Sequence, residues 1–374
     1  MRILVTGADG FIGKNLLVRL KENSSFKVST FSRCDSEETL KQQVFCADAI
    51  FHLAGENRPE STEQFDIGNR LLTQKICDLL RDFDKKTPII LSSSLQAELD
   101  NPYGASKRAA EVAVRALASE NGNPVAIYRL PGVFGKWCKP NYNSVVATFC
   151  HNIAHGLPIQ INNPDFLVKL VYIDDVVSSF LEYLDGEITD GVENIEVKPE
   201  YSSSLKDLAF QINQFKNCRS TLITEKVGSG FVRALYSTYV SYLPNEKFTY
   251  KLNSNVDNRG VFVEMLKTKD SGQFSYFTAH PGVTRGGHYH HTKTEKFLVI
   301  KGNAEFRFCN ILTGERYNLE TSDSEPMVVE TIPGWAHDIT NIGDDELIVM
   351  LWANEIFDHD KPDTIMKKIE NEKA

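Results

Sequence analysis

Cysteine is scarce in this sequence, and no two cysteines form a Cys-x-x-Cys pair. A disulfide-stapled domain and a thiolate zinc site both need paired cysteines, so neither is indicated. The odd count of seven fits thiols that stay reduced, as expected in a cytoplasmic protein. The seven are Cys34, Cys46, Cys77, Cys138, Cys150, Cys218 and Cys309.

Long apolar runs and a secretory leader are also missing. No apolar stretch approaches the roughly 18 residues that a membrane-spanning helix needs. The chain enters a strand pattern directly at Arg2 to Val5, without a basic segment followed by an apolar one. We therefore expect no membrane partner and a cytoplasmic location.

Blocks of basic residues are absent as well. The chain has 41 Lys and Arg against 50 Asp and Glu, a formal net charge of -9. Nucleic acids and anionic membranes attract basic patches, so neither is expected as the main partner. A local cluster of Arg and Lys can still bind an anionic small ligand.

The length of 374 residues exceeds what one compact domain usually needs, and two textures divide the chain. Up to about residue 200, short apolar runs alternate with amphipathic stretches, a pattern typical of a parallel sheet covered on both faces. Residues 243–260 are polar and turn-rich, and short alternating segments follow them. We predict an α/β fold class: a Rossmann-type doubly wound parallel sheet in residues 1–247, followed by an all-β barrel in residues 253–374.

A glycine-rich string follows the first predicted strand and opens a helix. Glycines let the backbone turn tightly and approach a pyrophosphate, whose charge the free N–H groups of the helix N-terminus stabilise. Such a string alone is weak evidence, but its place between strand and helix favours a dinucleotide site. The predicted cofactor contacts in it are Gly7, Asp9, Gly10, Phe11, Ile12 and Gly13.

The end of the second predicted strand indicates which cofactor is bound. An acidic residue there would bind the ribose of NAD, but the sequence has Ser32 and Arg33, and arginine can pair with the 2′-phosphate of NADP. We therefore expect NADPH; the alternative is that Arg33 is an ordinary surface residue. A later strand end, Leu53-Ala54-Gly55, finishes in small residues that suit a close approach to the cofactor.

A tyrosine and a lysine one helical turn apart carry the chemistry predicted for the first domain. Tyr103 and Lys107 share one helix face, so the ammonium can lower the pKa of the phenol while the tyrosine exchanges a proton with a substrate oxygen. A hydroxyl from the serine run 92–94 can hold that same oxygen. Because a lone Tyr-x-x-x-Lys is usually a surface pair, the surrounding motifs decide its meaning.

These motifs, together with the segments 128–135 and 171–176, occur in the order found in extended short-chain dehydrogenases/reductases, which roughly residues 1–245 resemble. The catalytic set that the resemblance implies is Ser94, Tyr103 and Lys107. Tyr103 would be the general acid/base, Lys107 would bind the nicotinamide ribose, and Ser93 is the alternative serine. The implied substrate is a nucleotide sugar, with candidate contacts Lys136, Lys139 and Asn143.

The second predicted domain contains Gly-x5-His-x-His-x4-Glu-x6-Gly and then Pro-Gly-x2-His-x3-Asn, which resemble the two cupin motifs. His-x-His on a strand puts two imidazoles on one face, where a carboxylate and a third imidazole can complete a metal site. The ligands on that match are His288, His290, Glu295 and His337. His291 would point to the opposite face unless a bulge intervenes. We expect zinc, with Fe(II), Mn(II) and Ni(II) left open by the ligand types.

The order reductase then cupin resembles bifunctional CapF-like capsular polysaccharide enzymes and their O-antigen counterparts over essentially the whole chain. The resemblance implies that the cupin epimerises C3 of a UDP-4-keto-6-deoxy-2-acetamido sugar. The first domain would then reduce the C4 ketone with NADPH, on the route to UDP-N-acetyl-L-fucosamine. It also implies a homodimer.

Other functions stay open at this point. They are a monofunctional sugar reductase with a structural or dimerising cupin, a cupin oxygenase fused to a reductase, and a non-catalytic NADP-binding regulator. The base that would remove the C3 proton is not indicated. Its candidates are Tyr276, His280, Lys293, Lys296 and Glu264.

Overall fold

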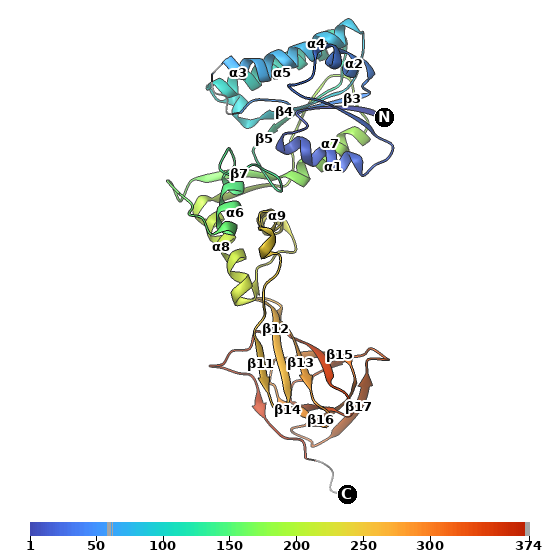
Figure 1. Ribbon diagram of the computed structural model, residues 1–374, viewed down its shortest axis with the longest axis vertical. Helices are drawn as coiled ribbons and strands as arrows, with labels where there is room; N and C mark the ends of the chain where they lie inside the picture. The colour runs from blue at the N-terminus through green and yellow to red at the C-terminus, as the bar shows by residue number, and fades with distance from the viewer. Residues whose placement is uncertain (58–60, 62, 371–374) are drawn as a thin grey trace. The chain divides into compact units, whose positions relative to one another are not determined.

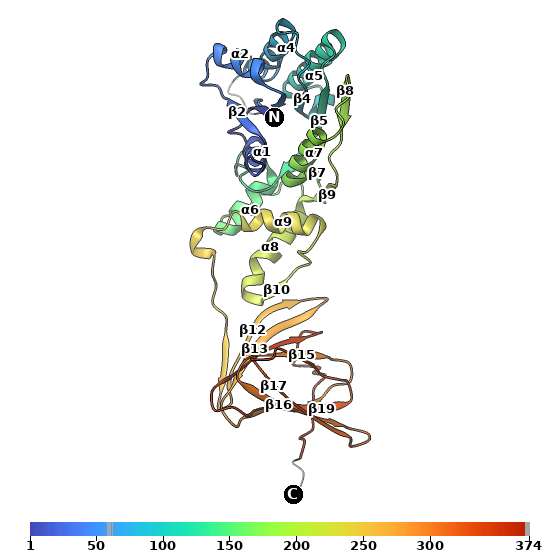
Figure 2. The ribbon, with the colours of Figure 1, turned by 90° about the vertical axis from the view of Figure 1, so that its right-hand side faces the viewer.

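The computed structural model describes residues 1–57, 61 and 63–370, and the chain forms two compact units (Figures 1 and 2). The first unit comprises Met1–Ile212 and Ser229–Pro244, and the second comprises Asn213–Gly228 and Asn245–Ala374. Residues 213–228 group with the second unit because the short strand β10, Ile223–Thr224, pairs with a strand of that unit. Among the described residues, no helix is long and apolar enough to cross a membrane.

A six-stranded parallel sheet organises the first unit, in the order β2-β1-β3-β4-β5-β8. Its strands are β1 (Arg2–Thr6), β2 (Lys27–Phe31), β3 (Ala49–His52), β4 (Ile89–Ser94), β5 (Val125–Leu130) and β8 (Val192–Ile195). Ile3, Leu4 and Val5 of β1 are all fully buried, as expected for a parallel strand covered on both faces.

Helices cover both faces of this sheet (Figure 1). Because side chains alternate along a strand, Ile3 and Val5 pack with α1 (Phe11–Lys21) and α7 (Ile173–Asp185), while Leu4 packs on the other face. The helices of that other face are α2 (Glu37–Cys46), α4 (Leu72–Asp82) and α5 (Pro102–Asn121). This doubly wound arrangement confirms the predicted α/β class.

Smaller elements complete the first unit. A second sheet has the order β6-β7-β9, formed by Gly132–Phe134, Leu167–Tyr172 and Glu200–Ser204. The remaining helical segments of the chain are α3 (Glu63–Phe65), a π-helix (Asp66–Leu71), a 3₁₀ turn (Leu95–Glu98), α6 (Val145–His155), α8 (Leu205–Thr221), α9 (Gly230–Val240) and a 3₁₀ turn (Asn245–Lys247).

The second unit is built from two mainly antiparallel sheets, as the predicted all-β region requires. One has the order β10-β12-β13-β20-β15-β18 with β11 beside β12, and the other has the order β17-β16-β19-β14-β21. Its antiparallel strands are β11 (Ser254–Asp257), β12 (Gly260–Thr268), β13 (Gly272–Ala279), β14 (Thr284–Tyr289), β15 (Glu295–Lys301), β16 (Asn303–Asn310), β17 (Arg316–Ser322), β18 (Val328–Glu330), β19 (Trp335–Asn341), β20 (Leu347–Ala353) and β21 (Ile365–Met366).

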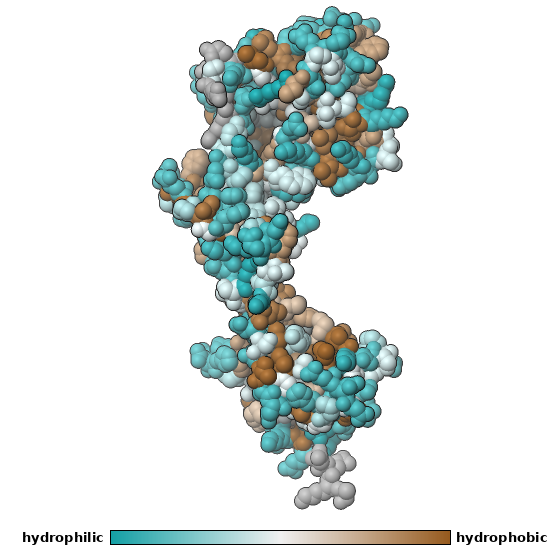
Figure 3. Space-filling view, in the orientation of Figure 1, coloured by the Kyte–Doolittle hydropathy of each residue, from teal (hydrophilic) through white to brown (hydrophobic). Residues whose placement is uncertain are grey.

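The apolar core of the second unit lies between these sheets. Phe277 and Phe297 come from the first sheet, and Phe306 and Ile339 come from the second. In Figure 3, hydrophilic side chains cover much of the visible surface of each unit, with scattered apolar patches between them. The core therefore follows the alternation of apolar and polar residues along the strands.

Candidate functional site

The glycine-rich string forms the tight turn between β1 and α1. Gly7 has a φ of +71°, and a Cβ there would lie 2.5 Å from the backbone nitrogen of Ala54. A Cβ on Gly13 would lie 2.3 Å from the carbonyl oxygen of Gly7. Gly10 precedes the first helical residue and offers no capping side chain, so the N-terminal N–H groups of α1 are not capped from that position.

The other residues of the string differ in exposure. Asp9 is exposed, whereas the side chains of Phe11 and Ile12 pack against the core. A cofactor at this turn would therefore meet the backbone N–H groups of Phe11 and Ile12, not their side chains. The strand end Leu53-Ala54-Gly55 lies directly against the turn, because the Ala54 N–H donates to Thr6 Oγ1 at 3.3 Å.

Ser32 and Arg33 both contact carboxylates of the protein. The Ser32 backbone N–H and hydroxyl donate to Asp35 at 2.7 and 2.9 Å. Arg33, whose side chain is 82% exposed, pairs with Glu56 at 2.6 Å. Because Glu56 directly follows the strand end at Gly55, this pair places the guanidinium at the edge of the predicted cofactor site.

The predicted catalytic residues meet where β4 ends and α5 begins. Helix α5 starts at Pro102, capped by the Asn101 side chain, so Tyr103 lies in its first turn and Lys107 one turn later. The Ser94 side chain lies close enough to the Tyr103 phenol to act on its pKa, which it lowers. Ser93 instead donates to Glu111 at 2.6 Å. The geometry thus favours Ser94 over Ser93 as the serine beside the tyrosine.

Burial shifts the ionisation of this pair in opposite directions. Burial lowers the pKa of Lys107 to about 8, opposed by the negative charge of Glu111, and its ammonium donates to the Ser92 carbonyl at 3.0 Å. Burial raises the pKa of Tyr103, opposed by the Ser94 side chain. Near neutral pH the phenol therefore keeps its proton, as a proton donor to a ketone must.

A buried polar network beside this site was missed by the sequence analysis. His52 hydrogen-bonds with Thr6 at 2.7 Å and with Thr73 at 2.8 Å, and burial, aided by the charge of Lys107, lowers its pKa to about 3. Asn69 accepts from the Glu56 N–H at 2.9 Å and donates to Ser106 at 2.8 Å. The network ties the strand end 53–56 to α5. No local pattern marks it, because its members are far apart in sequence.

The predicted sugar-nucleotide contacts have protein partners of their own. Lys136 donates to Asp174 at 2.5 Å, and the Lys139 ammonium lies 4.9 Å from the centre of the Tyr142 ring. Asn143 is exposed. The structure supplies no contact from any of the three to Ser94, Tyr103 or Lys107 among the described residues, so their role stays a prediction.

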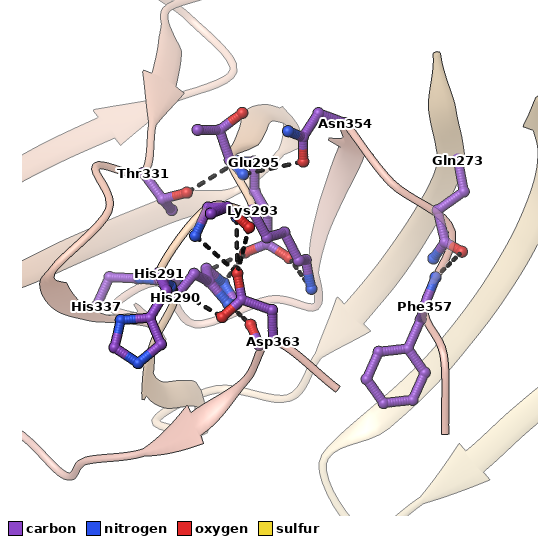
Figure 4. A network of polar contacts seen from close by, with 12 residues as sticks. Gln273, His290, His291, Lys293, Glu295, Thr331, His337, Asn354, Phe357 and Asp363 are labelled. Carbon is purple, nitrogen blue, oxygen red and sulfur yellow. Dashed lines mark hydrogen bonds and ion pairs between the residues drawn. The ribbon is translucent and has the colours of Figure 1, made fainter. Parts of the chain in front are cut away.

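In the second unit, the four predicted metal ligands come together. His288 on β14 pairs across to His337 on β19, His290 follows β14, and Glu295 begins β15. One ligand atom from each residue lies within 4.8 Å of all the others. His291 lies outside the group and is exposed; its backbone N–H donates to Asp363 at 2.9 Å, and its ring contacts the Tyr289 ring (Figure 4).

The spacing and protonation of this set fit a metal ion. The Nε2 atoms of His290 and His337 each lie 3.3 Å from the same Glu295 oxygen, close to the roughly 3.3 Å that separates ligand atoms in a tetrahedral zinc site. His290 Nδ1 lies 2.5 Å from the Asp363 carbonyl oxygen and must carry a proton to bond with it. Its Nε2 is then the nitrogen that faces the Glu295 carboxylate. The buried His337 Nε2 has no hydrogen-bond partner among the described residues. Three imidazoles and a carboxylate that converge in this way form a donor set that suits a divalent cation.

The charges around the set agree with this arrangement. Burial lowers the pKa of His288 to about 4, so its imidazole is neutral as a ligand must be. Burial of Glu295 acts to raise its pKa, but contacts with His290, His337 and Lys293 outweigh it and hold the pKa well below its usual range. The Lys293 ammonium lies 3.0 Å from the second Glu295 oxygen, which leaves the first oxygen directed at the histidines.

A cavity of about 140 Å³ opens onto the ligand set. Its walls include His288, Glu295 and His337 together with Phe277 and two arginines, Arg259 and Arg285. The sequence analysis assigned these arginines no role. In a regular strand, Arg285 and His288 would point to opposite faces, but the ladder shifts register between Gly286 and His288, so both line one cavity.

Arg285 carries a largely buried positive charge in this cavity. Its side chain is 12% exposed, Nε donates to the Thr278 carbonyl at 2.9 Å, and the guanidinium lies 5.3 Å from the centre of the Phe277 ring. Its Nη2 makes no hydrogen bond with the described residues; Asp257 is 3.8 Å away. Arg285 can therefore donate to an anionic group that enters the cavity.

None of the five base candidates is a cavity-lining residue. Tyr276 is 37% exposed and His280 is exposed, while Lys296 pairs with Glu330 and Glu264 with Lys267. Only Lys293 reaches the ligand set, through Glu295.

The first unit belongs to the Rossmann-like class of folds that bind NAD(P). Residues 3–193 match the NAD dependent epimerase/dehydratase family, and residues 255–365 match the polysaccharide biosynthesis C-terminal domain. The chain therefore belongs to the NAD dependent epimerase/dehydratase family.

One relative and two solved structures of CapF extend this similarity to the whole chain. A Pseudomonas aeruginosa protein named UDP-2-acetamido-2,6-beta-L-arabino-hexul-4-ose reductase is 56% identical, covering 97% of this chain and 98% of its own length. The crystal structure of CapF from Staphylococcus aureus is 42% identical, with a TM-score of 0.90 over 99% of this chain and 100% of that one. CapF with the inhibitor 3-isopropenyl-tropolone is 38% identical, with a TM-score of 0.86 and the same coverage. The predicted resemblance to CapF-like enzymes is confirmed.

The two adjacent histidines allow a matched test of the metal site. We expect His290→Ala to weaken Zn²⁺ binding by more than roughly 100-fold, because losing a ligand costs more than losing its outer partner. His291→Ala should leave binding unchanged, since His291 is exposed. Zn²⁺ titration against a chromogenic chelator measures both. Equal affinities in the two variants would contradict the assigned site.

Proposed function

We propose that the chain is a bifunctional nucleotide-sugar enzyme. Its second unit, as a cupin, epimerises C3 of a UDP-4-keto-6-deoxy-2-acetamido sugar, and its first unit reduces the C4 ketone with NADPH, toward UDP-N-acetyl-L-fucosamine. The name of the Pseudomonas aeruginosa relative supports a 4-keto sugar as substrate. Zinc as the metal and a homodimeric assembly belong to the same proposal.

The reductase half rests on Ser94, Tyr103 and Lys107. NADPH supplies the hydride when it is bound. Tyr103 donates its proton to the C4 oxygen as the hydride reaches C4, so the ketone becomes an alcohol and the phenolate is re-protonated from solvent. Ser94 hydrogen-bonds the same oxygen, and Lys107 binds the nicotinamide ribose and stabilises the phenolate. The raised pKa of Tyr103 suits a residue that must enter the reaction protonated.

NADPH is proposed over NADH because of the charge at the end of β2. Arg33 is 82% exposed and lies beside the strand end that faces the glycine-rich turn. Its present partner Glu56 is largely buried, with a side chain 13% exposed, so the outward face of the guanidinium is left for a 2′-phosphate.

The observation that carries the epimerase half is that the ligand set opens onto a cavity. Four protein ligands would complete a tetrahedral zinc site, so catalysis here would require the metal to accept a further ligand from the cavity. A bound divalent cation would be held by His288, His290, Glu295 and His337 and would supply Lewis acidity. Arg285 places a further positive charge and a free N–H donor in the same cavity. Removing the C3 proton leaves negative charge on the neighbouring C4 oxygen, which this guanidinium can stabilise.

The CapF inhibitor is consistent with a metal-dependent site. A tropolone presents adjacent ketone and hydroxyl oxygens, and oxygen donors of this kind bind divalent cations. We expect a tropolone that binds this chain to bind at the metal centre.

A paired assay with the UDP-4-keto-6-deoxy-HexNAc substrate tests both halves. Deuterium uptake at C3 in D₂O reports epimerisation without cofactor, and NADPH oxidation reports reduction. We expect His288→Ala to abolish exchange, and Tyr103→Phe to keep exchange but lower reduction by roughly 10²–10⁴-fold, the usual contribution of a general acid. NADH in place of NADPH should be oxidised more slowly.

Three other outcomes with the wild-type protein would each favour one of the alternative functions. NADPH oxidation without C3 exchange in the wild-type protein would leave a monofunctional reductase with a structural cupin. Oxygen uptake in the presence of ferrous iron would favour an oxygenase. Absence of any ketone-dependent NADPH oxidation would leave a binding protein.

The pH dependence of reduction should report Lys107. Since burial lowers its pKa to about 8, the ammonium is charged below that pH and loses its charge above it. We expect kcat/KM for ketone reduction to fall as pH rises through about 8, in a profile measured with NADPH. Glu111→Gln should move this alkaline limb to lower pH, because the Glu111 charge raises the pKa of Lys107. A profile that stays flat into the alkaline range would contradict this role.

The cavity arginine gives a separate test of the epimerase half. We expect Arg285→Gln to slow C3 exchange by roughly 10²–10³-fold, as removal of an oxyanion donor does elsewhere. Zn²⁺ affinity should stay at the wild-type value, because Arg285 is not a ligand. Arg316→Gln, an exposed arginine on β17, is the control and should exchange normally. Normal exchange in Arg285→Gln would remove Arg285 from the mechanism.

A further inference from the structure

Asp363, in the C-terminal segment before β21, binds the turn that links two of the metal ligands (Figure 4). Its carboxylate accepts from the backbone N–H groups of His291, Thr292 and Lys293 at 2.9, 2.7 and 2.9 Å. It also accepts from the Thr292 hydroxyl at 3.0 Å. Every residue between His290 and Thr294 is therefore held by one side chain from 70 or more positions away in the chain.

The backbone of Asp363 acts on a ligand directly. Its carbonyl oxygen accepts from His290 Nδ1 at 2.5 Å. A histidine that donates from one ring nitrogen to a fixed acceptor has its tautomer and ring orientation set, and its other nitrogen is left as the ligand. In this structure the other nitrogen is Nε2, which lies 3.3 Å from Glu295.

The residues after Asp363 hold the preceding strand. Met366 on β21 pairs with His288 on β14, and Ile365 pairs with Tyr289. The Lys367 N–H donates to the Gly287 carbonyl at 2.8 Å, next to the register shift that turns His288 inward. Segment 363–367, here called the C-terminal strap, thus contacts the backbone on both sides of His290.

We propose that Asp363 is a positioning residue for the metal centre, and that the C-terminal strap fixes His288 and His290 in their ligand geometry. This inference rests on the metal site of the proposed function. The side chain acts through the turn: its three N–H bonds set the distance between the Asp363 carbonyl and the His290 ring. Without them, the His290 ring is free to rotate about its side-chain bonds, and some of the metal's binding energy is spent in restoring its orientation.

Three variants of the full-length chain test the proposal, each stripped of metal and titrated with Co²⁺ and Zn²⁺. Asp363→Ala removes all the side-chain bonds, and we expect roughly 10–100-fold weaker binding, the usual cost of losing an outer partner. Asp363→Asn keeps one acceptor oxygen and should give an intermediate affinity. Asp360→Ala removes an exposed carboxylate from the same segment and should bind like the wild type.

The visible spectrum of bound Co²⁺ separates positioning from a loss of stability. A changed ligand-field spectrum in Asp363→Ala, with wild-type thermal unfolding in the apo state, supports positioning. If Asp363→Ala fails to fold, Asp363→Asn decides by the same two measurements. Wild-type affinity and spectrum in the folded variants would overturn this inference and leave the proposed function standing. A wild-type chain that binds neither ion would overturn both.

Discussion

Convergence of three imidazoles and one carboxylate on one point is the constraint that orders the second unit. Two imidazole nitrogens lie 3.3 Å from one buried carboxylate oxygen, a spacing that suits ligands of one cation. Strand pairing supplies the convergence, since His288 and His337 face each other across β14 and β19. The outer contacts then fix each group: the Asp363 carbonyl orients His290, and Lys293 holds the second oxygen of Glu295.

In the first unit, the main constraint is the burial of the Lys107 amine, at the edge of the parallel sheet where the cofactor is proposed to bind. Lys107 is 7% exposed, and its ammonium is held by the Ser92 carbonyl, while a Cβ on Gly55 would lie 2.9 Å from it. That close approach leaves little room for a side chain at position 55 while Lys107 keeps this position. The Lys107 ammonium therefore loses its proton as pH rises through about 8, whereas Tyr103, one helical turn earlier, keeps its proton.

Together the two sites suit consecutive steps on one ketone. Under the proposed function, removal of a proton beside a carbonyl needs stabilisation of negative charge, which a metal held by the ligand set and Arg285 would provide. Reduction of the same carbonyl removes the acidity that made epimerisation possible, so the second step makes the first irreversible. A chain that carries both activities can commit an epimerised intermediate to product soon after it forms.

The sequence by itself determined the fold class, the glycine-rich turn and the Tyr103 and Lys107 pair, because each depends on a local period or spacing. The four ligands were predicted from the resemblance to the two cupin motifs, since no local period brings His337 to the other three. Strand and helix periods decide which side chains share a face over a few residues. Contacts between distant segments were decided only by the tertiary structure. Glu111 accepts a hydrogen bond from the Ser93 hydroxyl, so Ser94 is the serine beside Tyr103. The Asp363 carbonyl accepts a hydrogen bond from the His290 ring. A bulge in β14 brings Arg285 beside His288, which no alternation rule predicts, because one extra residue reverses the facing of all that follow.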